Sequence, residues 1–402
     1  MSVADIAATF DPGFSVTAHI PGGSARILAQ DKPEDLRIGL KQDPGGDFDG
    51  HYHFRITGAR GKQCRITFVN AVTLSGGFAA LVARRGGTAA GPWGDTGPRL
   101  SYDRKNWIRV MGRIEGTDYI AEFTRESDIC YIAQWAPYSI DRELDFIAAL
   151  QRSGMVRCGS LGRTLLGSDI DYVMVGDASP AKRQCWLIGR QHPSETMSGF
   201  FMEGLLTRLT DAGDSVCKAL LDQAVIHVVP NINPDGSGGA FTRLNGGIAD
   251  LNRCWEEPDP EISPEVYWVQ KRMVATGVDF FMDCHGDEEL PCVFLAGPLK
   301  PPYGSDRQNR LFHAFELAWA ATSPDYEPHQ PYPGGEPTSC SVTRAWHWAA
   351  DRFDCLSVLL EQPFKDTSCT PDPLRGWSPE RASALGASFI DALFGVVGQL
   401  RV

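Results

Sequence analysis

An alternation of strand-like and helix-like segments, beginning near residue 130, constrains the fold of this chain more than any other feature. Short apolar stretches such as CWLIG, AVIHVV, VDFFMDC and CLSVLL are typical of buried strands. Segments with apolar residues at helical spacing separate them. This order predicts an α/β fold, with a mixed, largely parallel sheet covered by helices on both faces. In such sheets, ligands bind beyond the carboxyl ends of the strands.

The predicted helices carry start signals that fix their positions. Ser139 is a predicted N-cap, and Leu144 and Ile147 follow it at helical spacing, so we expect both to face the core. Ser263 is followed by Pro264, a pair that is typical of the first helical position.

The first part of the chain has a different character. HYHFRITG alternates apolar and polar residues, and glycine-rich turns separate it from further strand-like segments. We predict an N-terminal β-sandwich over residues 1–128 and a second, catalytic domain over residues 129–402. His51 and His53 would share one face of a strand. A packing role is the simpler interpretation of this pair, and a metal or ligand role is the alternative.

Charge and cysteine content exclude several classes of function. The formal net charge of −12 disfavours nucleic-acid binding, because phosphate contacts need clustered basic side chains. No apolar run approaches the roughly 18 residues of a membrane span. The first residues lack the basic and apolar regions of a signal peptide. Eleven cysteines, an odd number without a CxxC pair, favour reduced thiols in a cytoplasmic protein.

Polar residues follow several of the predicted strands. His192 and Glu195 follow CWLIG, His285 follows VDFFMDC, and Glu361 follows CLSVLL. Each alone would be read as a capping or strand-end residue. Together, two histidines and a glutamate form a ligand set that leaves one zinc position open, which is the pattern of catalytic sites. We therefore predict one Zn²⁺ ion, with Glu361 as the general base that takes a proton from water.

Two arginines bracket the loop TRLNGGIADLNR. Arg243 and Arg253 could hold a carboxylate with a bidentate fork or stabilise an oxyanion, although surface arginines are the simpler interpretation without a zinc site. Asp250 could accept the second ring N–H of a histidine ligand, and a turn aspartate is an equally good interpretation. HExxH, Walker and GxSxG motifs are missing from the sequence.

These motifs together resemble one known family. HPSE, NINPDG, TR, DLNR, DCHG and LLE resemble the M14 zinc metallocarboxypeptidases, and the β-rich segment leading into WAPYSIDRELDFI resembles the cytosolic carboxypeptidase subfamily. The resemblance implies a carboxypeptidase-like domain that follows a β-sandwich. It assigns these roles: zinc ligands His192, Glu195 and His285; substrate carboxylate binding by Asn252 and Arg253; carbonyl polarisation by Arg243; catalysis by Glu361; and support of the first histidine ligand by Asp250.

The resemblance also implies a preference for acidic residues, because this subfamily removes glutamates from C-termini and from side-chain polyglutamate. Such a preference needs a basic pocket. Arg344 lies where the family places its specificity residue, and Lys365 follows the catalytic glutamate. For both, a solvated side chain is the alternative. The family's tyrosine upstream of that glutamate has no counterpart in TSCSVTRAWHWAADRFD, and Tyr332 is the nearest upstream tyrosine.

The predicted function is that of a zinc carboxypeptidase acting on the C-terminal tails of peptides or proteins, with neither nucleic acid nor membrane as a partner. Two alternatives share parts of this pattern. A zinc amidohydrolase acting on N-acyl amino acids would share HxxE and the distant histidine. A non-catalytic module would use the pocket to grip C-terminal tails, but it would not need Glu361.

Overall fold

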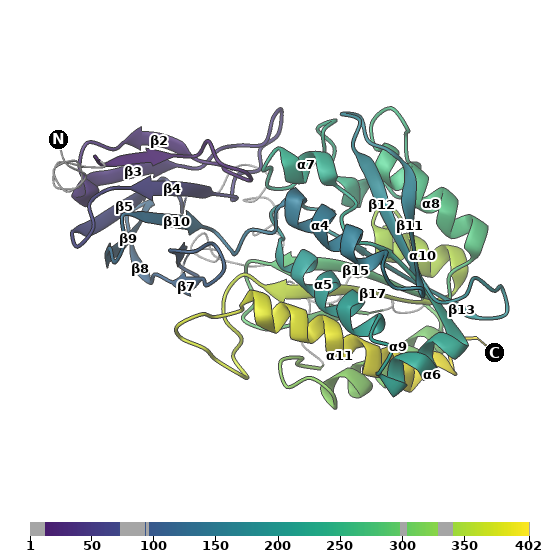
Figure 1. Cartoon of the computed structure of the whole chain (residues 1–402). Coiled ribbons are helices and arrows are strands. Elements are labelled where there is room, and N and C mark those ends of the chain that lie inside the picture. Colours follow the sequence, from purple (N-terminus) through teal and green to yellow (C-terminus); the bar gives the residue numbers. More distant parts are fainter. Residues whose placement is uncertain (1–12, 73–92, 94–95, 298–303, 329–340, 402) are drawn as a thin grey trace.

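The computed structural model describes residues 13–72, 93, 96–297, 304–328 and 341–401. It has two parts, an N-terminal β-sandwich and an α/β part, and Figure 1 shows the sandwich beside the α7 end of the α/β part.

Among the described residues, the sandwich has two five-stranded sheets. In spatial order, the first sheet contains β1 (Ser15–Thr17), β4 (His53–Thr57), β10 (Ile129–Ala133), β6 (Arg99–Ser101) and β7 (Ile108–Arg109). The second contains β2 (Arg26–Ala29), β3 (Leu36–Gly39), β5 (Gln63–Val69), β9 (Asp118–Thr124) and β8 (Gly112–Glu115), and a short 3-10 helix η1 (Pro33–Asp35) precedes β3. Phe54 and Ile56 of β4 pack with Ile66 and Phe68 of β5 in one core. The alternation in HYHFRITG therefore corresponds to a sandwich strand, as predicted.

The strand β10 belongs to the sandwich. It pairs with β4 and β6, and its residues Cys130 and Ile132 are buried in the sandwich core. The expected domain boundary at residue 128 placed this strand with the second domain, whereas the chain leaves the sandwich only after Ala133. His51 and His53 are both buried, and the His51 Nε2 atom lies 3.2 Å from the Gly22 carbonyl oxygen.

The α/β part is built on a seven-stranded mixed sheet, as far as the described residues show. In spatial order, its strands are β11 (Val156–Arg163), β12 (Asp169–Val175), β14 (Ala224–Val229), β13 (Arg183–Gly189), β15 (Phe280–Asp287), β17 (Leu356–Pro363) and β16 (Phe294–Ala296). The four central strands are parallel to one another, and antiparallel strands flank them on both sides. The predicted mixed sheet with a parallel centre is confirmed.

Helices cover both faces of this sheet. One face carries α4 (Ile140–Leu150), α5 (Met197–Leu209), α6 (Ser215–Gln223), α9 (Asp306–Ala320) and α11 (Pro379–Val397). The other carries α8 (Pro264–Thr276) and α10 (Ala345–Phe353), and two short elements, α7 (Pro234–Gly238) and η2 (Leu251–Arg253), lie in the connections. Neighbouring residues of β13 enter opposite cores: Leu187 packs with α5 and α11, and Trp186 packs with α8 and α10. This double burial explains why CWLIG is apolar throughout.

The helices α4 and α8 begin where the sequence predicts, but one residue of α4 that was expected to face the core is exposed. Ser139 caps α4 with its side chain, and α8 begins at Pro264. Leu144 is 51% exposed, so its predicted inward orientation is wrong. Glu143 is buried in its place, because its carboxylate accepts a hydrogen bond from Asn231 at 3.1 Å and lies 3.8 Å from the Arg190 guanidinium.

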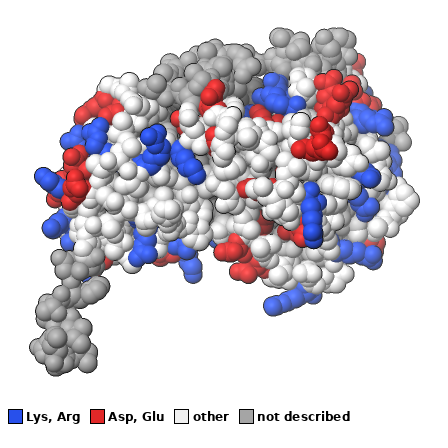
Figure 2. Space-filling view, turned by 90° about the horizontal axis from the view of Figure 1, so that it is seen from above, with Lys and Arg blue, Asp and Glu red and all other residues white. Residues whose placement is uncertain are grey.

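The surface of the molecule carries charges of both signs, and the described cysteines form no disulfide bonds. No helix in the described part of the chain is long and apolar enough to cross a membrane. The ten described cysteines are free. On the face shown in Figure 2, basic and acidic side chains are interspersed over both parts of the molecule. A mixed face creates no strong field of one sign, so recognition of a charged ligand depends on local contacts.

Candidate active site

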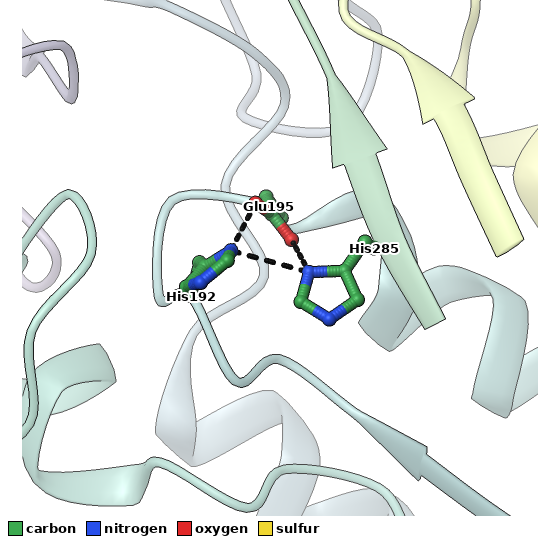
Figure 3. A group of neighbouring side chains, drawn as sticks. All are labelled: His192, Glu195 and His285. Carbon is green, nitrogen blue, oxygen red and sulfur yellow. Dashed lines mark hydrogen bonds and ion pairs between the residues drawn. The ribbon is translucent and has the colours of Figure 1, made fainter. Parts of the chain in front are cut away.

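Three buried side chains meet at the carboxyl ends of two neighbouring parallel strands (Figure 3). His192 and Glu195 lie in the loop after β13, and His285 lies near the end of β15. The Nδ1 atoms of the two histidines are 3.1 Å apart. The Glu195 carboxylate bridges them, with Oε1 at 2.6 Å from His192 and Oε2 at 2.8 Å from His285. The structure thus brings together the three residues that the sequence indicated as zinc ligands.

The outward-facing nitrogens of both rings show that this donor set fits zinc. His192 Nε2 lies 3.3 Å from Asp250 Oδ1, and His285 Nε2 lies 2.9 Å from Asp283 Oδ2. In the zinc-bound form, a ring N–H donated to each carboxylate would leave both Nδ1 lone pairs facing inward. Two such lone pairs repel each other at 3.1 Å unless a cation lies near them. Ligand atoms about 2.05 Å from a tetrahedral zinc ion are roughly 3.3 Å apart, close to this spacing.

The carboxylates of this group are held in their ionised form. Burial opposes ionisation of Glu195, but His192 and His285 outweigh it and hold the pKa of this carboxyl below its usual range. Burial also opposes ionisation of Asp250, yet Arg243 and His192 hold its pKa well below the usual range. Charged oxygens are the form that a zinc ligand and its supporting acceptor need.

A buried arginine shapes the loop that carries the first ligands. Arg190 directly follows β13 and has a φ of 58°, in the left-handed region that side chains other than glycine rarely adopt. Its guanidinium donates to the carbonyl oxygens of Tyr138 at 3.0 Å and Pro193 at 2.9 Å. These bonds offset the backbone strain and turn the chain toward His192, an arrangement found mostly at functional sites.

Two supporting residues were not predicted from the sequence. Asp283 accepts from the Gln191 side chain at 2.6 Å, and Gln191 in turn accepts from the Trp255 indole N–H at 2.9 Å. This chain of bonds fixes the carboxylate behind His285. A signal was present, because Asp283 precedes His285 by two residues and alternate residues of a strand share a face.

Glu361 lies beside the metal group, which consists of His192, Glu195 and His285. It is the register partner of His285 across the parallel pair β15 and β17, and paired positions on adjacent strands point to the same face. Its side chain is 6% exposed. Both residues were expected just after their strands, whereas the strands continue to Asp287 and Pro363. The glutamate is therefore held by the sheet itself.

Arg243 is joined to the metal group through Asp250. Its Nε atom donates to Asp250 Oδ2 at 2.8 Å, and the other oxygen of Asp250 faces His192. The Arg243 guanidinium also lies over the ring of Phe48, with its central carbon 5.2 Å from the ring centroid. Asp250 thus links one arginine to one histidine, which agrees with the supporting position expected for it.

The predicted carboxylate-binding pair lies on η2. The Asn252 Nδ2 atom is 3.5 Å from His285 Nε2, which places this amide next to the metal group. The Asn252 carbonyl oxygen accepts from the Arg253 guanidinium at 2.6 Å, and the Arg253 side chain is exposed. An exposed cation beside the buried metal group is accessible to an anionic substrate.

Arg344 lies close to this pair. The Asn252 side-chain oxygen accepts from the Ala345 backbone N–H at 3.1 Å, so the start of α10 runs alongside η2. Burial, and then the charges of Arg344 and Arg253, lower the pKa of His347 to about 3. Both arginines therefore lie near His347.

Lys365 and Tyr332 are the remaining candidates. Lys365 is buried, and its carbonyl oxygen accepts from the Trp377 backbone N–H at 2.9 Å and from the Arg99 guanidinium at 3.4 Å. Arg99 belongs to β6, so the Lys365 backbone lies against the sandwich, and its role in specificity stays a prediction. Tyr332 falls outside the described residues.

Comparison with known proteins identifies relatives of both parts of the chain. Residues 16–135 match the family model for the cytosolic carboxypeptidase N-terminal domain, and residues 143–280 match that for zinc carboxypeptidase. An uncharacterised protein of Zymomonas mobilis is 37% identical over 96% of this chain and 97% of its own length. Mouse cytosolic carboxypeptidase 6 is 27% identical over 44% of this chain, and the match spans 35% of the mouse protein.

Solved structures of other proteins are similar to this chain over nearly its whole length. A metallo-carboxypeptidase from Burkholderia cenocepacia is 36% identical with a TM-score of 0.87, covering 94% of this chain and 97% of that one. A metallo-carboxypeptidase from Pseudomonas aeruginosa, in complex with (2-guanidinoethylmercapto)succinic acid, is 31% identical with a TM-score of 0.89, covering 96% and 100%. Fold and site define a zinc metallocarboxypeptidase. The chain belongs to the M14 family, in the branch that carries the cytosolic carboxypeptidase N-terminal domain.

Proposed function

We propose that this enzyme removes the last residue from the C-terminal tails of peptides or proteins and prefers acidic last residues, including those of polyglutamate. The observation that carries the proposal is that the predicted zinc ligands and the predicted carboxylate-binding pair lie together at one edge of the sheet. His192, Glu195 and His285 converge beside Glu361. Asn252 contacts His285 through its side-chain amide, and its backbone carbonyl oxygen accepts from the exposed guanidinium of Arg253.

Each side chain has one task in the proposed reaction. When bound, zinc supplies Lewis acidity, which polarises a carbonyl group and acidifies water. Arg253 and Asn252 bind the terminal carboxylate of the substrate. Glu361 takes a proton from the attacking water and delivers it to the amine that leaves when the C–N bond breaks. Arg243 stabilises the negative charge that develops on the carbonyl oxygen.

The acidic preference is supported by a second cation in the same neighbourhood. Arg253 would be occupied by the terminal carboxylate, which leaves Arg344 to pair with a second carboxylate on the last side chain. Both arginines act on His347, and Arg344 adjoins the residue that is hydrogen-bonded to Asn252. A neutral last residue would leave Arg344 without this partner.

We also propose that the enzyme binds one zinc ion and is located in the cytoplasm. The donor set supports one zinc ion, and zinc content measured per chain would test this. The ten free cysteines and the relatives named cytosolic carboxypeptidases support a cytoplasmic location. Fractionation of cells that express the untagged protein would test it.

The direct test of the specificity is a set of peptides that differ only in the last residue, assayed with and without a chelator. Glu and Asp are compared with Leu, and Lys and Arg are included because the Pseudomonas relative was solved with a guanidino-succinic acid. We expect the highest kcat/KM for Glu and loss of all turnover with the chelator. Preferred release of Lys would overturn the acidic preference. Turnover of N-acyl amino acids with none of peptides would favour the amidohydrolase alternative.

A further inference from the structure

We propose that Asp43, in the β-sandwich, is a positioning residue that holds Arg243 in its working geometry, so that the sandwich forms part of the active site. This inference rests on the proposed function, in which Arg243 stabilises the charge on the scissile carbonyl.

The Asp43 carboxylate fixes the backbone on which Arg243 stands. It is 4% exposed and accepts three consecutive backbone N–H groups of the catalytic part. Oδ1 accepts from Thr242 at 2.6 Å, and Oδ2 accepts from Arg243 at 2.7 Å and Leu244 at 2.9 Å. Hydrogen bonds to an ionised acceptor are shorter and roughly twice as strong as neutral ones. Three of them on adjacent residues leave this backbone little freedom.

The same sandwich loop also contacts the Arg243 side chain. The Asp43 backbone N–H donates to the Phe48 carbonyl at 2.9 Å, which closes the loop and sets the two side chains relative to each other. Phe48 presents its ring to the guanidinium, and Asp250 accepts from the Nε atom at 2.8 Å. A ring face attracts a cation that lies within about 6 Å of its centroid, so Phe48 favours this orientation of the guanidinium. Asp43 and Phe48 thus hold the backbone and the side chain of one arginine.

Thr242 extends this support to the loop with the zinc ligands. Its hydroxyl oxygen accepts from the His51 backbone N–H at 3.2 Å, which is a second bond from the sandwich. Its carbonyl oxygen accepts from the Ser194 backbone N–H at 3.3 Å and from the Ser194 hydroxyl at 2.8 Å. Ser194 directly precedes Glu195 in the sequence. The sandwich is therefore joined through one residue to the loop that carries two of the three ligands.

Loss of the Asp43 charge is expected to affect chemistry more than substrate binding. A misplacement of about 1 Å in a catalytic group can lower a rate by about 100-fold. Arg243 acts on charge that develops only in the transition state, so its displacement lowers kcat and leaves KM nearly unchanged. A contact that served only to dock the sandwich would change stability without this separation of kcat from KM.

The first test compares Asp43→Asn with the matched variant Asp103→Asn. The amide would place a donor against backbone N–H groups. We expect about a 10- to 100-fold lower kcat with unchanged zinc content and little change in KM. Asp103 accepts two backbone N–H groups within the sandwich, from Lys105 at 2.8 Å and Asn106 at 2.7 Å, and its variant should keep the wild-type kcat. Equal kcat values for the two variants would overturn the inference.

The second test is a double-mutant cycle with Arg243→Ala. If Asp43 acts through Arg243, Asp43→Asn should lower kcat by less than about twofold in the Arg243→Ala background. A full multiplicative loss would overturn the inference and leave the proposed function intact. An Arg243→Ala variant with wild-type activity would instead overturn the role of Arg243 itself. If Asp43→Asn does not fold, Phe48→Leu takes its place in the cycle, because this change removes only the ring face. A loss of less than about twofold in the Arg243→Ala background would again support the inference, and a full multiplicative loss would overturn it.

Discussion

The two halves of the active site are built differently. In the metal half, His285 and Glu361 lie in β15 and β17, and His192 lies in the loop directly after β13. All three are buried, and each histidine is held by a carboxylate. The proposed substrate half lies on η2 and at the start of α10, where Arg253 is exposed and Arg344 is half-buried. The proposed reaction thus takes place at the buried edge of the sheet, while the proposed selectivity depends on connections that tolerate change more easily.

Removal of the metal should have the largest effect, because every proposed chemical step depends on this half. We expect dialysis against a chelator to reduce hydrolysis to the uncatalysed background, and added zinc to restore it. Activity and zinc content measured on the same samples check this. Full activity in a zinc-free sample would show that the metal half is not the reactive half.

Glu361→Gln tests the general base within the metal half. We expect kcat to fall by about 10²–10⁴-fold with zinc content unchanged, because the amide cannot take a proton from water. The matched control is Glu203→Gln on α5, where the glutamate pairs with Arg142 at 2.8 Å at the surface. A Glu361→Gln variant as active as this control would remove Glu361 from the mechanism.

Asp283→Asn tests whether the supporting carboxylates hold the metal half rigid. We expect metal affinity to fall by about 10- to 100-fold, because His285 loses its charged acceptor. Competition with a zinc-binding dye measures this. Asp279→Asn is the control, since Asp279 precedes the same strand and accepts from the Gln184 backbone N–H at 2.7 Å. Equal affinities for the two variants would contradict the role given to Asp283.

Arg344→Gln should have the smallest and most selective effect. We expect kcat/KM to fall about tenfold for peptides that end in Glu, about 1.4 kcal/mol, and to change little for peptides that end in Leu. Arg352→Gln, an exposed arginine on the same helix α10, should leave both values unchanged. An equal loss on both peptides would assign Arg344 to general substrate binding and move selectivity elsewhere.

The sequence points to the residues of the metal half because their signals are local. His192 and Glu195 are three residues apart, and apolar runs mark the strands before His285 and Glu361. Supporting residues are harder to predict, since their partners are distant. Asp43 contacts a loop about 200 residues away, and nothing near it in the sequence signals this bond. Glu143 is buried in place of Leu144 because it meets Asn231 and Arg190, which only the fold brings together.

The most direct test of the central claim is a pair of identical peptides ending in Glu, one with a free terminal carboxylate and one with a terminal amide. The zinc-loaded enzyme should release one glutamate from the free acid and cleave the amide at least about 100-fold more slowly, because Arg253 loses its charged partner. Equal cleavage of the two peptides would contradict the claim that this site recognises a free C-terminus.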